Sequence, residues 1–161
     1  MILGIGNILL SDEGFGVHVA RRLKKMKLPD NVRVEEGGVG GFNLLGHLEG
    51  VDKLLVVDVM WMNTPPGELY IINPEQELKE PGKQIVSFHQ IGVLELVQLG
   101  KLIGNNPEVT YLVTRPEKML WSTELSPALQ SAMEKAVALL IAKCNEFNSD
   151  IEKGAEYYAS C

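Results

Sequence analysis

The chain has 161 residues, of which 45% are hydrophobic and 22% are charged, a balance that excludes a mainly disordered protein. Its 15 Lys and Arg residues stand against 21 Asp and Glu residues, so the formal net charge is −6. A nucleic-acid-binding protein needs a basic surface to neutralise phosphates, and this charge balance therefore argues against a nucleic-acid partner.

The sequence carries no sign of a membrane segment. The longest apolar run, residues 54–62, is interrupted by Asp58 and is far shorter than the roughly 20 residues that cross a bilayer. No basic stretch precedes the apolar start of the chain, unlike in a secretory signal. We therefore expect a cytoplasmic protein without membrane contact, and a monomer, because no feature of the sequence argues for a dimer.

The first elements in the chain are a strand and an amphipathic helix. Residues 2–5 predict the strand, and a glycine-containing loop then leads into a helix over residues 12–26. Phe15, Val19 and Leu23 recur at helical spacing and so predict the buried face of this helix. His18, on the same helix, and His47 are expected at the surface.

The next stretch predicts three more strands and a short helix. A strand over residues 32–35 is followed by a glycine-rich loop at 36–41 and a short helix at 42–48. The run at 53–58 is continuously apolar up to its final aspartate, which is typical of a central parallel strand buried on both faces. Residues 68–72 follow a Pro-Pro-Gly turn and predict an antiparallel edge strand.

The C-terminal half repeats this alternation. Residues 85–88 precede a helix at about 92–102, and a last strand covers 109–113. Ser126-Pro127 predicts the start of a final helix that ends near residue 147. The pattern as a whole predicts a three-layer α/β/α fold with a twisted, mostly parallel five-stranded sheet and one antiparallel edge strand. We expect one domain over residues 1–147 and a loosely ordered tail over 148–161.

Three polar side chains occupy strand ends or helix starts in this interpretation. Glu13 opens the first helix, Asp58 ends the buried strand, and His89 follows residues 85–88. Ligands of open parallel sheets gather beyond the carboxyl ends of the strands, and two carboxylates with an imidazole suit divalent nickel, zinc or manganese. Each residue also has an ordinary structural explanation, such as a helix-dipole contact for Glu13, so spacing alone does not establish the site.

Other chemistries fit the sequence less well. Gly4-Ile5-Gly6 begins a dinucleotide-binding fingerprint, but Leu9 replaces its third glycine, and Asp12 beside Glu13 would repel a phosphate. The motifs HExxH and GxSxG are absent. A hydrolase with this sequence would therefore use a metal and a bound water rather than a side-chain nucleophile.

Four motifs together resemble one known family. Gly4-x-Gly6-Asn7 is followed by Asp12-Glu13-Gly14-x-Gly16-Val17, and then in order by Glu36-Gly37-Gly38, Val56-Val57-Asp58 and His89-Gln90-Ile91-Gly92. In these residues the chain resembles the nickel–iron hydrogenase maturation endopeptidases, from residue 2 to about residue 145. Glu36 and Val39 stand where that family usually carries Asp and Thr. The family fold, a twisted sheet with helices on both faces, agrees with the predicted order of elements.

The resemblance implies an endopeptidase that removes a C-terminal extension from the large-subunit precursor of a nickel–iron hydrogenase after nickel insertion. It implies metal contact and catalysis by Glu13, Asp58 and His89, and substrate binding by Glu36, Gly37 and Gly38. Nickel would be supplied by the precursor rather than held by the free protein. The same metal-contacting residues could instead serve a nickel carrier or assembly chaperone that hydrolyses nothing. Trp61 and Met62, just beyond Asp58, could shape a precursor-specific groove or serve as ordinary packing.

Overall fold

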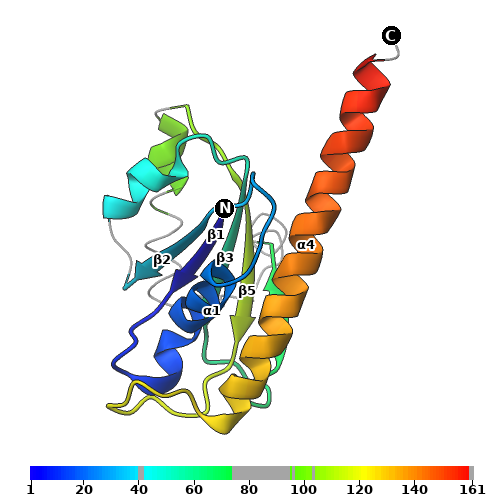
Figure 1. The fold of residues 1–161 in the computed structure, drawn as a ribbon. Coiled ribbons are helices and arrows are strands. Elements are labelled where there is room, and N and C mark those ends of the chain that lie inside the picture. Colours follow the sequence, from blue (N-terminus) through cyan, green and yellow to red (C-terminus); the bar gives the residue numbers. More distant parts are fainter. Residues whose placement is uncertain (40–41, 74–94, 96, 103, 160–161) are drawn as a thin grey trace.

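A computed structural model describes residues 1–39, 42–73, 95, 97–102 and 104–159 of the chain (Figure 1). The expected strand at 85–88, His89 and the first residues of the expected helix at 92–102 lie outside the described residues, whereas 95 and 97–102 are helical. The strands are β1 (Ile2–Ile5), β2 (Val34–Gly38), β3 (Lys53–Val59), β4 (Leu69–Ile72) and β5 (Glu108–Thr114). The helices are α1 (Phe15–Lys24), α4 (Pro127–Ala159) and the 3-10 helices η1 (Ser11–Gly14) and η2 (Phe42–Leu48).

The described strands form one sheet in the order β2-β1-β3-β5-β4. β1 pairs in parallel with β2 and with β3, and β3 pairs in parallel with β5. β4 runs antiparallel to β5 at the sheet edge. The structure thus confirms the mostly parallel five-stranded sheet with one antiparallel edge strand, and it places the continuously apolar segment β3 at the centre, where both faces are covered.

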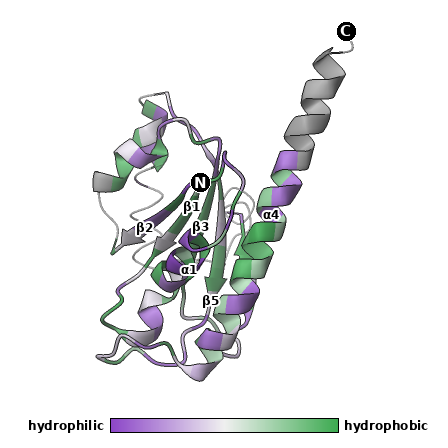
Figure 2. Cartoon of the chain, in the orientation of Figure 1, coloured by the Kyte–Doolittle hydropathy of each residue, from purple (hydrophilic) through white to green (hydrophobic). Residues whose placement is uncertain are grey.

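Alternation along the strands divides the core into two layers. Leu55 and Val57 of β3 pack on the side of α1 and α4, whereas Leu54 and Val56 pack against η2 and Val97 on the opposite side. In Figure 2 the central strands and the stretch of α4 beside the sheet are largely green, that is, hydrophobic. Helical segments therefore cover both faces of the sheet, as the three-layer prediction requires.

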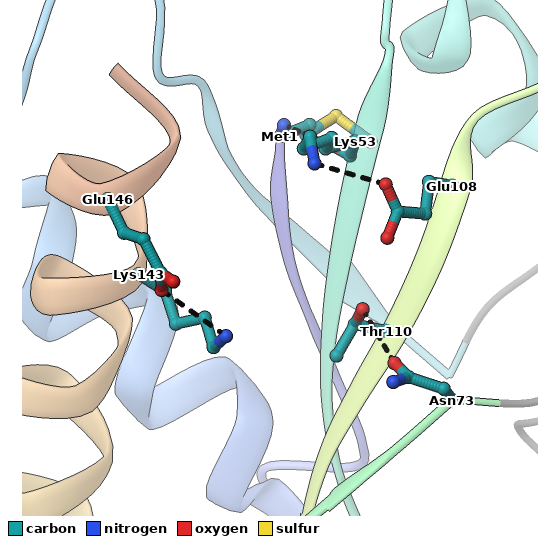
Figure 3. A network of polar contacts seen from close by, with 7 residues as sticks. All are labelled: Met1, Lys53, Asn73, Glu108, Thr110, Lys143 and Glu146. Atoms are coloured by element: carbon teal, nitrogen blue, oxygen red, sulfur yellow. Dashed lines mark hydrogen bonds and ion pairs between the residues drawn. The ribbon is translucent and has the colours of Figure 1, made fainter. Parts of the chain in front are cut away.

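Polar pairs fix the strands at the edge where β3 and β5 begin (Figure 3). Lys53 and Glu108 are partners in the β3–β5 register, and Lys53 Nζ lies 3.1 Å from Glu108 Oε2. Thr110 Oγ1 of β5 donates a hydrogen bond of 3.0 Å to Asn73 Oδ1, just beyond the end of β4. These contacts align β5 with both of its neighbours, β3 and β4. They thereby set which residues of β3 and β5 lie where these two strands end.

The helix predicted over residues 12–26 is divided into η1 and α1. Gly4 and Gly16 allow α1 to lie directly on the sheet, because a Cβ atom on Gly16 would overlap the backbone oxygens of Val57 and Ile5. A Cβ atom on Gly4 would in turn overlap the Gly16 oxygen. This close approach places η1, the segment just before α1, against the end of β3.

The final helix α4 begins at Pro127, as predicted, and the Leu129 N–H donates a hydrogen bond of 3.4 Å to Ser126 Oγ. Its predicted end near residue 147 is wrong, because the helical backbone continues to Ala159. Residues 148–159 contain good helix formers such as Ala, Glu and Lys, and a single interior glycine weakens a helix without ending it. The division into a domain over 1–147 and a tail over 148–161 stays a prediction. No helix within the described ranges is long and apolar enough to cross a membrane.

Candidate functional site

The carboxyl ends of the four parallel strands lie at one edge of the sheet, which we call the catalytic edge. β1 leads there into η1, and β3 and β5 end in register at Val59 and Thr114. In Figure 1 the blue segment after β1 and the yellow segment after β5 lie together at this edge, next to the start of α4. This is the position where open α/β sheets bind their ligands.

Asp58 is fully buried within β3, close to the catalytic edge. Its Oδ1 accepts a hydrogen bond of 2.8 Å from the Val59 N–H. In the register it faces Val113 of β5, on the side of the sheet to which Val56 and Tyr111 also point. Burial, and to a lesser degree the charge of Asp58, raises the pKa of the Tyr111 phenol above its usual value. Asp58 is thus a fully buried acid in surroundings where water screens electrostatic interactions little.

Glu13 lies on η1, which packs against β3. Its Oε2 atom is buried and has no hydrogen-bond partner among the described residues. Glu13 lies in the first turn of η1, directly before Gly14, the N-cap of α1, where a negative charge also suits the helix dipole, but the dipole does not explain a buried oxygen without a partner. A buried carboxylate oxygen without a partner costs free energy, which suits an atom that binds a cation or substrate group at this edge.

The structure brings Glu13 and Asp58 to the same edge, whereas His89 lies outside the described residues. Within the described ranges, no group of three or more His, Cys, Asp and Glu side chains could hold a metal ion. The described part of the site thus offers two carboxylates, oxygen donors that suit a divalent cation. The three-residue set stays a prediction.

The predicted substrate-binding residues lie on β2, whose carboxyl end is at the same edge of the sheet. Glu36 and Gly38 line a shallow hollow of about 260 Å³ together with Asn7 and Arg21. Gly38 adopts a φ of 55°, and its carbonyl oxygen accepts a hydrogen bond of 2.6 Å from the Gly6 N–H, which joins the ends of β1 and β2. Gly37 points into the apolar core instead, since a Cβ atom there would lie 2.8 Å from Cγ2 of the buried Ile5.

Arg21 is a residue of this hollow that the sequence interpretation missed. Its Nε donates a hydrogen bond of 2.8 Å to Glu36 Oε2, and Lys24 Nζ lies 3.8 Å from Glu36 Oε1. The Arg21–Glu36 pair is partly exposed, so it contributes little to stability, on the order of 1 kcal/mol or less. The sequence did contain a signal for Arg21. Val17 and Arg21 are four residues apart on α1, so they lie on the same face of this helix, and both line the hollow.

Asp12 is a second residue whose role the sequence interpretation missed. Its carboxylate is fully buried and accepts hydrogen bonds from the backbone N–H groups of Glu117 (2.9 Å), Lys118 (3.0 Å) and Ser126 (2.7 Å). Ser11, with a φ of 54°, donates from Oγ to the Glu124 oxygen at 2.9 Å. These residues fasten the segment after β5 to η1. Asp12 therefore holds the catalytic edge together.

The histidines differ in their surroundings. His47 is about half exposed, and its Nδ1 lies 3.8 Å from Glu35 Oε1, as expected of a surface residue. His18 is only partly exposed, and its Nε2 is buried without a hydrogen-bond partner among the described residues. Burial and the neighbouring Arg21 charge lower the pKa of His18, against a hydrogen bond with the Thr123 backbone that raises it. The surface prediction for His18 is thus only partly correct.

The lowered pKa of His18 predicts a loss of stability in acid. The unfolded chain takes up the proton near the usual value of 6.5 while the folded chain resists it, so the free energy of unfolding falls as the pH drops below that value. We expect urea titrations at pH 7 and pH 5 to show a smaller loss for His18→Gln than for the wild type. An equal loss in both proteins would contradict this role of His18.

Comparison with solved structures assigns the chain to a class. The hydrogenase maturating endopeptidase HybD from Escherichia coli superposes with a TM-score of 0.78 at 30% sequence identity, covering 90% of this chain and 91% of that one. The shared fold is therefore that of a maturation endopeptidase.

Sequence comparisons give the family. A model of the hydrogenase maturation protease family matches residues 17–143. Hydrogenase 2 maturation protease of Escherichia coli (strain K12) is 31% identical over 149 residues, covering 91% of this chain and 90% of that protein. Hydrogenase expression/formation protein HupD of Bradyrhizobium diazoefficiens is 32% identical over 142 residues, covering 86% of this chain and 74% of that protein. The chain belongs to the hydrogenase maturation protease family, whose members hydrolyse peptide bonds, and the resemblance seen in the sequence is confirmed.

Proposed function

We propose that this protease removes a C-terminal extension from the large-subunit precursor of a nickel–iron hydrogenase, and that nickel already bound in the precursor is what it recognises. The observation that carries the proposal is the buried, unpartnered Oε2 atom of Glu13 on a segment packed against β3, which also bears the buried Asp58. Carboxylates of this kind suit a divalent cation brought by a substrate. We place the reaction in the cytoplasm and take the monomer as the acting form.

In this proposal Glu13, Asp58 and His89 contact the precursor's nickel and thereby fix the scissile bond at the catalytic edge. Positioning of this kind can lower a barrier by several kcal/mol. A water molecule then attacks the scissile carbonyl carbon, the C–N bond breaks, and the leaving amine takes up a proton. The water loses its proton either to one of the carboxylates as general base or because the substrate's metal lowers its pKa.

The hollow beside Glu36 is the proposed binding site for the chain that flanks the scissile bond. Glu36 and Arg21 present both signs of charge there, and Gly38 keeps its backbone open because no atom lies within 4 Å of an added Cβ. An extended peptide can lie in such a hollow. Its polar groups can then bind Arg21 or Glu36 in place of the ion pair that these two residues form with each other. Gly37 would contribute through its backbone.

Nickel dependence is tested with one precursor prepared in two forms, nickel-loaded and metal-free. We expect the loaded form to lose its C-terminal peptide, seen by intact-mass spectrometry, and the metal-free form to keep it. Cleavage of both forms would retain the protease and overturn recognition through nickel. As a control, adding free nickel to the protease before it meets the metal-free precursor should not restore cleavage.

The alternative, a nickel carrier without hydrolytic activity, makes the opposite prediction for the free protein. A carrier must bind free nickel tightly, whereas a few ligands without a closed coordination shell hold a metal weakly. Equilibrium dialysis of the protein alone separates the two functions. Tight, stoichiometric binding together with an uncleaved, correctly loaded precursor would favour the carrier.

A further inference from the structure

Several large apolar side chains are exposed at the catalytic edge, on the segments that follow different strands. Their exposed fractions are 50% for Leu9, 59% for Trp61, 62% for Leu120 and 83% for Trp121. Single exposed apolar residues are common on protein surfaces, but a group of them at one edge is a feature of interaction sites. We call Leu9, Leu120 and Trp121 the apolar platform.

Backbone contacts set Leu9 and Trp121 side by side. Leu10 and Ser122 form a parallel β-bridge, which makes Leu9 and Trp121 the residues that precede each bridge partner. The Ser122 N–H donates to the Leu9 oxygen at 3.1 Å, and the Ser11 N–H donates to the Ser122 oxygen at 2.7 Å. Side chains at equivalent positions of paired strands lie on the same side, so Leu9 and Trp121 share one surface. Leu120, which is 62% exposed, precedes Trp121 directly in the chain.

The platform is held rigidly from beneath. The buried Asp12 carboxylate binds the backbone at both ends of the segment that carries Leu120 and Trp121, through Glu117 and Ser126. Binding to a surface that is already ordered costs little further conformational entropy.

Trp61 follows β3 at the same edge and lies next to the segment that leaves β5. The Arg115 guanidinium lies 6.0 Å from the centre of its ring, and Arg115 Nη1 donates to the Thr64 oxygen at 2.7 Å. Glu117 and Lys118, which precede Leu120 and Trp121 on the same segment, are exposed and add polar groups to this edge. An apolar centre with a polar rim is the usual composition of a protein–protein interface.

We propose that the apolar platform and Trp61 dock the folded body of the hydrogenase large-subunit precursor, as distinct from its C-terminal extension. The inference rests on the proposed function and deepens it. Continuity with the site supports this occupant, because Asp12, which holds the platform, is adjacent to Glu13. Each tryptophan can bury about 200 Å². The two of them would therefore supply roughly half of the ~800 Å² that each partner contributes to a standard interface.

The test is steady-state cleavage of the nickel-loaded precursor by a Leu120→Ser/Trp121→Ser double variant. We expect KM to rise about tenfold or more with kcat unchanged, because these side chains contact the precursor but not the reacting bond. Leu102→Ser is the matched control, since Leu102 is 82% exposed but lies shortly before the start of β5, at the other edge of the sheet. It should cleave with wild-type KM.

The outcomes separate the docking proposal from the proposed function. If the wild type fails to cleave the loaded precursor, the proposed function fails, and docking fails with it. If the wild type cleaves and the double variant shows the wild-type KM, the docking surface is wrong while the protease stands. Sedimentation of both proteins checks a second copy of this chain as occupant: a wild-type dimer that the double variant abolishes, with KM unchanged, would overturn the proposal.

Discussion

Asp58→Asn is expected to lower the rate of precursor cleavage by about 10²-fold or more while leaving the fold intact. Asparagine has the shape of aspartate, and its Oδ1 can still accept the hydrogen bond from the Val59 N–H. What the variant loses is the negative charge of a fully buried carboxylate at the catalytic edge. Without that charge the side chain can neither attract a cation strongly nor take a proton from water.

The measurement is the initial rate of mass loss from the nickel-loaded precursor, with a thermal melt to confirm folding. Asp52→Asn is the matched control, because Asp52 is exposed and immediately precedes the same strand, β3, at the opposite edge of the sheet. It should cleave at the wild-type rate. A folded Asp58→Asn protein with wild-type activity would remove Asp58 from the site.

Asp12→Ala is expected to lower the free energy of unfolding by about 3 kcal/mol or more. The substitution removes the acceptor for the backbone N–H groups of Glu117, Lys118 and Ser126 and leaves the Ser126 group buried without a partner. For a domain of this size such a loss is a large part of a total stability of roughly 5–15 kcal/mol. Urea unfolding followed by circular dichroism measures it.

Glu13→Gln, one residue further along η1, should leave the free energy of unfolding almost unchanged and lower the cleavage rate. Glu13 Oε2 makes no hydrogen bond within the described part of the chain, so the variant should stay within about 1 kcal/mol of the wild-type stability. Its cleavage rate should nevertheless fall, because Glu13 contacts the substrate's metal in the proposed site.

Unchanged stability in Asp12→Ala would contradict the anchoring role of Asp12.

Much of the sheet could be predicted from the sequence because its signals are local. The apolar run of β3, with an acid near its end, already indicated a buried central strand and a site residue at Asp58, and both the strand and its burial are confirmed. The Pro-Pro-Gly turn before β4 likewise indicated the antiparallel edge strand. The spacing of apolar residues along a strand and the residue types that form a turn both depend on a few neighbouring residues, so they can be seen directly in the sequence.

The role of Asp12 could not be predicted in this way. Its hydrogen-bond partners lie 105 to 114 residues further along the chain, so the local sequence shows only an acid near a helix start. The same limit applies to Gly16, whose need for glycine comes from the oxygens of two strands packed beneath it. Tertiary contacts decide these positions, and they also divide the predicted first helix into η1 and α1.

The most direct test of the whole account is the mass of the products released from a nickel-loaded large-subunit precursor of the same organism. The account predicts a single internal cut that yields a shortened large subunit and one intact C-terminal peptide, with no shorter fragments at early times. Stepwise loss of residues from the C-terminus would contradict an endopeptidase positioned by the precursor's metal, and no loss at all would contradict the protease itself.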